Sequence, residues 1–192
     1  MSSYHCFDVE RKMSQNKISL NWLEISNYIL EIIEKESRQY EGILVLCIGS
    51  DRSTGDSLGP LTGTFLKETY ERIEVVGTLD EPVHAMNLAD VVSNISTENK
   101  LIIVVDAAMG EVKGKIGIKQ GSIAPGQGIG RQFDAIGDVS IAGIVNKDFG
   151  KSEVNKRLLA STSLNEVYSM ARCIARALHY AFYRYNKIFK TA

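Results

Sequence analysis

The sequence predicts an α/β fold, a three-layer α/β/α sandwich built around a mainly parallel sheet. Two continuous apolar runs, GILVLCIG at 42–49 and LIIVVDAAMG at 101–110, have the pattern of strands buried on both faces, which is typical of parallel sheets. Segments of helical periodicity separate the predicted strands, as they do in βαβ units. A length of 192 residues, with 44% hydrophobic and 23% charged side chains, suits one globular domain.

The chain opens with a polar stretch, residues 1–17, that shows no periodicity. We expect a flexible tail there, followed by a single α/β domain over residues 18–192. Ser19 is placed to cap a helix that ends near Tyr40, because apolar residues recur at helical spacing between them.

The elements that follow come from the same two patterns, apolar runs for strands and helical spacing for helices. In chain order we expect a strand at 42–49, helix at 61–72, strand at 73–79, helix at 83–96, strand at 101–110, weaker strands at 113–122 and 138–146, and a long helix at 164–189. The stretch from about 147 to 163 is expected to be a mobile surface loop.

Charge and cysteine content narrow the class of protein. The formal net charge is −1, from 22 basic and 23 acidic residues, so no basic excess points to a nucleic-acid partner. The cysteines are Cys6, Cys47 and Cys173, which form neither a disulfide framework nor a C-x-x-C motif. The sequence has neither the apolar region of a secretory signal nor a run that approaches the ~18 residues of a membrane span. We therefore expect a cytoplasmic protein with no membrane partner.

Two aspartates follow or end the two most apolar predicted strands. Asp106 ends LIIVVD, and Asp56 lies in the loop CIGSDRSTGDSLGP at 47–60, directly before a helix. Ligands bind at the carboxyl ends of the strands in open α/β sheets, and neighbouring strands lie about 5 Å apart. The two carboxylates are therefore expected to face one another across a cleft. The alternative is structural, with Asp56 as a helix N-cap and Asp106 satisfied by backbone amides.

The composition of the loop at 47–60 suits a binding site. Gly49 and Gly55 are expected to let the backbone turn sharply and approach a ligand, through positive φ. Short hydroxyl groups, among them Thr54, offer hydrogen bonds. The run IAPGQGIG at 123–130 contains Gly126 and Gly128 and is expected to present backbone N–H groups to a substrate, although a plain series of turns explains it equally well.

Three motifs in order, TGDSLGP, VVDA and IAPGQGIG, resemble those of the germination protease family of spore-forming bacteria. The resemblance covers residues 42–190 and is closest to the small YyaC-type sporulation proteins related to that family. It implies a phosphorylase/hydrolase-like α/β/α sandwich shared with the hydrogenase maturation proteases. It also implies an endopeptidase that depends on two aspartates, with Asp56 and Asp106 as the catalytic pair. The implied substrates are small acid-soluble spore proteins, and the implied compartment is the forespore or spore core.

A second polar group follows the strand predicted at 73–79. Asp80, Glu81 and His84 lie within five residues, and His84 is expected to assist the aspartates or to bind substrate. Blandly, the two acids favour a helix N-terminus. Hydrogenase maturation proteases bind nickel through two acids and a later histidine, and no histidine follows Asp106 until His179. We expect no cofactor, with a metal-dependent hydrolase using Asp56, Asp106 and His84 as an alternative.

Other nucleophiles and binding motifs have weaker support. Cys47 lies inside a predicted buried strand and suits a small hydrophobic residue better than a nucleophile. No G-x-S-x-G elbow surrounds Ser53 or Ser57, and GSDRSTG is not a dinucleotide-binding fingerprint. Arg52 and Arg131 are expected to face solvent.

The last helix carries more aromatic side chains than one buried face requires. They are Tyr180, Phe182, Tyr183, Tyr185 and Phe189. We expect a homodimer that covers some of them. For the whole chain the leading hypothesis is an aspartate-dependent spore endopeptidase, and the alternative from another class is a non-catalytic sporulation protein that binds or assembles through the same fold.

Overall fold

The structure is a computed structural model, and it describes residues 4–8, 22–36, 40–70, 73–125 and 135–189. Its strands are β1 (His5–Asp8), β2 (Gly42–Cys47), β3 (Glu74–Val76), β4 (Lys100–Gly110), β5 (Lys115–Gln120) and β6 (Val139–Lys147). Its helices are α1 (Trp22–Glu36), the short 3-10 helix η2 (Gly55–Ser57), α2 (Leu58–Thr69), α3 (Leu88–Asn94), α4 (Ser152–Ala160) and α5 (Leu164–Phe189).

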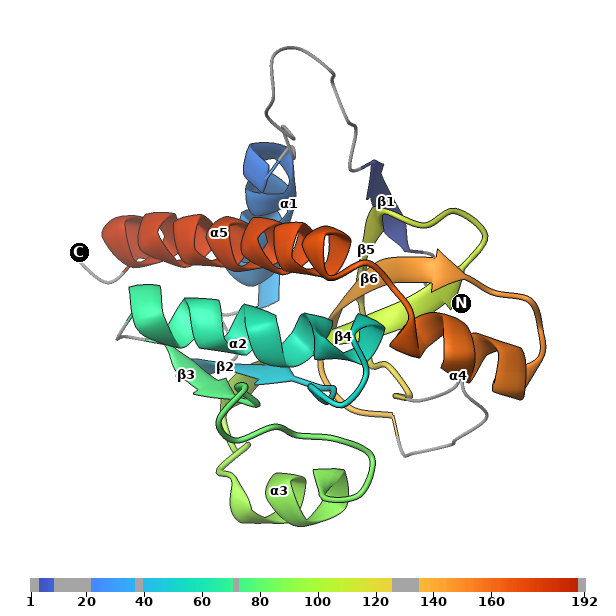
Figure 1. The fold of residues 1–192 in the computed structure, drawn as a ribbon. Coiled ribbons are helices and arrows are strands. Elements are labelled where there is room, and N and C mark those ends of the chain that lie inside the picture. Colours follow the sequence, from blue (N-terminus) through green and yellow to red (C-terminus); the bar gives the residue numbers. More distant parts are fainter. Residues whose placement is uncertain (1–3, 9–21, 37–39, 71–72, 126–134, 190–192) are drawn as a thin grey trace.

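The strands form one six-stranded sheet in the order β1-β5-β6-β4-β2-β3. Its central pairs β2–β3, β2–β4 and β4–β6 are parallel, whereas β5 runs antiparallel to both β6 and β1. Helices α2 and α5 lie over one face of the sheet with α1, and α3 lies below the opposite face (Figure 1). The predicted α/β fold with a mainly parallel sheet between helices is confirmed.

The alternation of side chains along the strands divides the core into two clusters, one on each face of the sheet. Leu101, Ile103 and Val105 of β4 belong to the larger cluster, which includes the buried faces of α1 and α5. Val104, one residue along, belongs to the smaller cluster with Leu88 of α3. Because β4 is buried on both faces, its sequence shows no alternation, and this is why it reads as one apolar run.

Two sequence expectations are corrected by the fold. The stretch 147–163 is not a loop throughout, because Ser152–Ala160 forms α4. Only Asn155 and Leu159 of this short helix are fully buried, so the apolar signal was too sparse to find it. Within the expected tail, His5–Asp8 is strand β1, held by backbone pairing to β5, and pairing with a distant strand leaves no local pattern in sequence.

Element boundaries differ more modestly. The helix expected over 83–96 is shorter in the structure, since α3 spans Leu88–Asn94. The expected start of the first helix at Ser19 lies outside the described residues, and that helix ends at Glu36 rather than near Tyr40. Among the helices that the structure describes, none has the length and hydropathy of a membrane span.

Candidate active site

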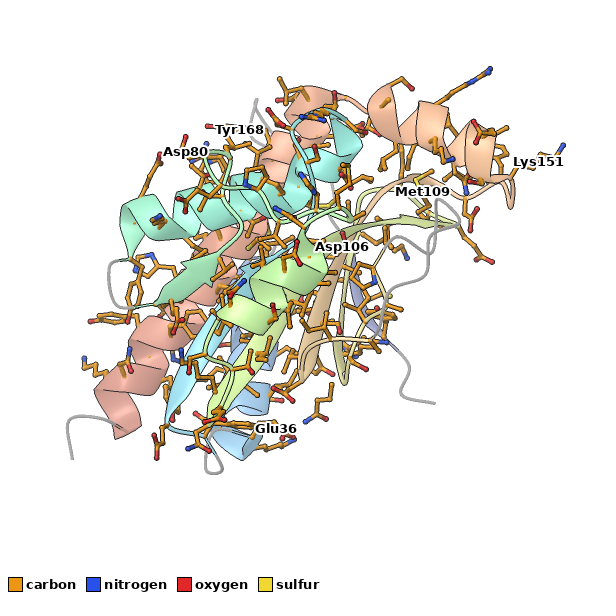
Figure 2. The ribbon with its side chains drawn as sticks, turned by 90° about the horizontal axis from the view of Figure 1, so that it is seen from below. Glu36, Asp80, Asp106, Met109, Lys151 and Tyr168 are labelled. Carbon is orange, nitrogen blue, oxygen red and sulfur yellow. The ribbon has the colours of Figure 1, made fainter. Side chains whose placement is uncertain are left out.

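Asp106 lies where β4 runs past the end of its neighbour β2. Pairing between the two strands ends at Cys47 and Val105, while β4 continues beside β6 as far as Gly110. Asp106 is therefore not the end of its strand, as the sequence predicted, because the small residues after it extend the pairing with β6. It is the first residue of β4 beyond the carboxyl end of β2, which keeps it at the expected edge of that part of the sheet (Figure 2).

The carboxyl group of Asp106 is almost completely buried, with 6% of the residue exposed. Burial is the largest cause that raises its pKa, and the nearby charge of Asp56 raises it further, to about 8. The backbone N–H of Ala107 donates a hydrogen bond to Oδ1 at 2.8 Å, which lowers the pKa but does not offset the burial. At neutral pH, Asp106 is consequently a neutral carboxylic acid beside a second acidic side chain.

Asp56 lies in η2, at the point where the loop after β2 turns into α2. Its carbonyl oxygen accepts a hydrogen bond from the N–H of Ser50 at 3.2 Å, which closes the loop on itself. The hydroxyl of Ser57 donates to the carbonyl of Thr54 at 2.6 Å. Ser57 occupies the N-cap of α2, so Asp56 does not hold the capping position that the bland interpretation assigned to it.

The two glycines of the loop are needed for different reasons. Gly49 has φ +147, and a side chain there would collide with the carbonyl oxygen of Asp56. The predicted positive φ is wrong for Gly55, which is not among the positive-φ residues. Gly55 is instead packed against α4, where an added Cβ would lie 2.7 Å from Cδ1 of Leu159.

The end of α4 supports η2 from behind. Thr162 Oγ1 would lie 3.1 Å from a Cβ on Gly55, and it donates a hydrogen bond to the carbonyl of Leu158 at 2.9 Å. Asn146, on β6, ties the two strands of this support together, since its Nδ2 donates to the Leu158 carbonyl at 3.1 Å and to Thr162 Oγ1 at 3.2 Å. The segment that the sequence suggested was a mobile loop thus holds the turn that carries Asp56.

His84 lies beside the start of the same loop, through the neighbouring backbone. The Val83 carbonyl accepts a hydrogen bond from the Gly49 N–H at 2.7 Å. Asn87 holds the loop at His84, because its Oδ1 accepts from the His84 N–H at 2.8 Å. Nδ1 of His84 accepts from the Met86 N–H at 3.3 Å, so this ring nitrogen is already engaged locally.

The rest of the second polar group does not join the aspartates. Asp80 and Glu81 are exposed, and Asp80 lies apart from Asp106 (Figure 2). Among the described residues, no three His, Cys, Asp or Glu side chains are grouped as a metal site requires, so Asp56, Asp106 and His84 do not fit that alternative in the arrangement seen.

Other predicted site residues fall in three groups. Cys47 is fully buried in β2 and burial raises the pKa of its thiol, as a small core residue requires. Thr54 is half-buried and Arg52 is exposed. Gly126, Gly128 and Arg131 lie outside the described residues, so the expectations for them stay predictions. In the same loop as Asp56, the buried Ser53 Oγ has no hydrogen-bond partner among the described residues.

Sequence reasoning missed one polar side chain near the aspartates. Tyr4, assigned to the tail, is close enough to Asp106 for that carboxylate to raise its pKa. No local pattern marks this residue, because only the pairing of β1 with β5 brings it to the sheet.

Comparison with known proteins assigns the chain to a family. The profile of a family described as "Protein of unknown function (DUF1256)" matches residues 13–177. The chain belongs to this family. A DUF1256-type relative, the "Uncharacterized protein YyaC" of Bacillus subtilis (strain 168), is 41% identical over 157 residues, which are 78% of this chain and 75% of the relative. The predicted resemblance to YyaC-type proteins is therefore confirmed.

One solved structure gives a similar fold to this DUF1256 chain. It is a [NiFe] hydrogenase maturation protease, HycI, from Thermococcus kodakarensis KOD1, with 16% sequence identity and a TM-score of 0.46. The match covers 79% of this chain and 99% of the other.

Proposed function

We propose that this protein is an endopeptidase that hydrolyses a peptide bond of a protein substrate with the carboxyl groups of Asp56 and Asp106. One observation carries the proposal. A buried carboxyl, neutral at pH 7, lies within electrostatic reach of a second carboxyl at the carboxyl edge of an α/β sheet. Pairs of acidic groups whose environments separate their protonation states are typical of acid–base catalysis.

The proposed reaction divides proton transfer between the two aspartates. The Asp56 carboxylate takes a proton from water as the water oxygen forms a bond to the scissile carbonyl carbon, and Asp106 gives its proton to the carbonyl oxygen. In the second step the carbon–nitrogen bond breaks. Asp56 then protonates the leaving nitrogen, and a hydroxyl of the intermediate returns a proton to Asp106. The products are a carboxylic acid and an amine, and both side chains regain their starting states.

The structure of the loop supports this division. Asp56 is held by η2, whose position depends on contacts with α4 and on the backbone link from Ser50. Asp106 is held by β4 and by the Ala107 N–H. Both carboxyl groups therefore come from rigid elements, which preorganises them for a reaction that requires a fixed geometry. The two aspartates titrate as a coupled pair, and the assignment of roles describes the resting state.

The proposed substrate class, small acid-soluble spore proteins, comes from the resemblance to germination proteases, as does the proposed place of action inside the sporulating cell. The test is digestion of one such spore protein by the wild type and by Asp56→Asn, Asp106→Asn and Asp51→Asn. Asp51 is an exposed acid of the same loop, so its variant controls for the loss of a negative charge.

We expect cleavage by the wild type and by Asp51→Asn, and loss of at least about 10³-fold in kcat/KM for the other two variants, on the scale of removing an essential acid or base. Circular dichroism melts of all four proteins show whether they are folded. Undiminished cleavage by folded Asp56→Asn or Asp106→Asn would refute the aspartate mechanism. Absence of cleavage by the folded wild type, together with binding of the intact spore protein, would favour the non-catalytic alternative.

A further inference from the structure

A row of four residues crosses the sheet from β1 to the candidate site. Cys6 pairs with Gly117, Gly117 with Ala142, and Ala142 with Asp106. Directly paired residues point to the same face of a sheet. The side chains of Cys6 and Asp106 therefore lie on one face, and the two residues between them, glycine and alanine, leave that face low.

Tyr4 fills part of this low strip. It precedes Cys6 by two residues, so the alternation of the strand directs it to the face of Asp106. Its ring lies over Gly117, because a Cβ on that glycine would be 3.1 Å from Cδ1 of Tyr4. The ammonium group of Lys119 lies 4.7 Å from the ring centroid, within the range of a cation–π interaction. The ring is thus fixed by β5, with only Gly117 and Ala142 between its strand and β4.

We propose that Tyr4 is the third polar residue of the Asp56–Asp106 site, and that its phenol O–H donates a hydrogen bond to the substrate carbonyl oxygen as water attacks. The inference rests on the proposed peptidase function for its chemistry, but the position of Tyr4 does not. A donor aimed at the oxygen where negative charge develops stabilises the transition state more than the ground state.

The electrostatics of the strip agree with a donor role. Burial is the largest cause that raises the pKa of Tyr4, followed by the charges of Asp106 and Cys6. The charged or titratable groups that face the phenol from the described neighbouring strands are Asp106 on β4, Cys6 on β1 and Lys119 on β5. The phenol consequently keeps its proton at neutral pH, and Lys119 stays on its ring.

The kinetic test compares Tyr4→Phe with Tyr183→Phe on the same spore-protein substrate. Phenylalanine keeps the ring over Gly117 and removes only the hydroxyl, while Tyr183 lies exposed on α5. We expect Tyr4→Phe to lower kcat by about 10- to 100-fold with little change in KM, toward the range for loss of one oxyanion donor, and Tyr183→Phe to match the wild type. An unchanged kcat in Tyr4→Phe would overturn the proposal.

A second measurement separates this inference from the proposed function. Nuclear magnetic resonance of the full chain, labelled with ¹³C at tyrosine Cζ, follows the titration of Tyr4, whose signal is identified by its loss in Tyr4→Phe. We expect Asp106→Asn to lower the pKa of Tyr4, because it removes the nearby carboxylate. A pKa of Tyr4 that does not respond to Asp106→Asn would place the phenol outside the site, whether or not the protein cleaves peptides. A response without any cleavage would support the position of Tyr4 and count against the peptidase.

Discussion

Asp106 combines nearly complete burial with a hydrogen bond from Ala107 that favours its charged form. The raised pKa shows that burial is the stronger effect. At the scale of single residues this group costs folding energy whenever it is ionised, as buried acids do. Natural proteins retain such costs mainly at functional positions, and the same property that suits Asp106 for proton donation makes its stability effect measurable.

The first prediction concerns the pH dependence of stability. In the unfolded chain Asp106 has its ordinary pKa of 3.8, and in the folded protein about 8. Between these values only the folded state holds the proton, so the free energy of unfolding falls by about 1.4 kcal/mol per pH unit from this group, and levels off above the folded pKa. Urea unfolding between about pH 5 and about pH 9 should therefore show Asp106→Asn losing less stability than the wild type. Parallel losses in the two proteins would contradict the raised pKa.

The second prediction concerns the coupling of the two aspartates. Asp56→Asn removes a charge that raises the pKa of Asp106 but leaves the burial unchanged. The pKa of Asp106 should then fall below about 8 and remain above 3.8, because burial is the larger cause. Titration of the ¹³C-labelled aspartate carboxyl measures this, with Asp51→Asn as the control. If the pKa of Asp106 is the same in both variants, Asp56 does not interact with it.

At the scale of elements, the position of Asp56 depends on η2 and on the helix behind it. Gly55 lies against Leu159 of α4, and the Asn146 side chain joins β6 to the end of that helix. Helix α4 has few buried residues of its own, so its main contact with the site is this support. The arrangement is a second layer of residues that fixes the first, as preorganised sites require.

The third prediction tests that support. Gly55→Ala places a Cβ 2.7 Å from both Cδ1 and the carbonyl oxygen of Leu159, and overpacking of this kind costs about 1–3 kcal/mol. We expect it to displace η2 and to lower kcat more than it raises KM. Gly42→Ala is the matched control, since its Cβ would meet only Lys100 Cγ at 3.6 Å. Equal activity and stability in the two variants would show that α4 does not hold the Asp56 turn.

At the scale of the whole molecule, the aromatic side chains of α5 divide between core and surface. Phe182 is buried at 2% exposure, whereas Tyr180 and Tyr183 are 36% and 51% exposed. Tyr180 packs edge-on against Trp22 of α1, so part of the aromatic excess is explained within one chain. The side chain of Phe189 lies outside the described residues. What is left is a surface formed by Tyr180, Tyr183 and Arg184, where the ring of Tyr180 lies near the Arg184 guanidinium.

The fourth prediction is that the protein is a homodimer through this surface. Tyrosine and arginine are enriched in the buried centres of protein interfaces. Tyr183→Glu would place a charge in the interface and should shift the sedimentation coefficient to that of a monomer at micromolar concentration. Phe149→Glu is the control, because Phe149 is equally exposed, at 54%, but lies on the loop between β6 and α4. A wild type that sediments as a monomer contradicts the prediction.

The sequence by itself determined the fold class and the two aspartates. Buried parallel strands leave continuous apolar runs, and a carboxylate or glycine-rich loop at the end of such a run is visible in one dimension. Strands β2 and β4 and helix α5 were located in this way. These signals are local, since each lies within one element or at its end.

Only the tertiary structure decided which residues complete the site. It brings Tyr4 to the face of Asp106 through a row of pairings across four strands, and it places α4 behind Gly55. It also separates Asp80 from the aspartates and raises the pKa of Asp106 by burying it. Burial and contact between distant segments depend on how elements pack together, and a short polar stretch carries no periodic signal of the partner against which it packs.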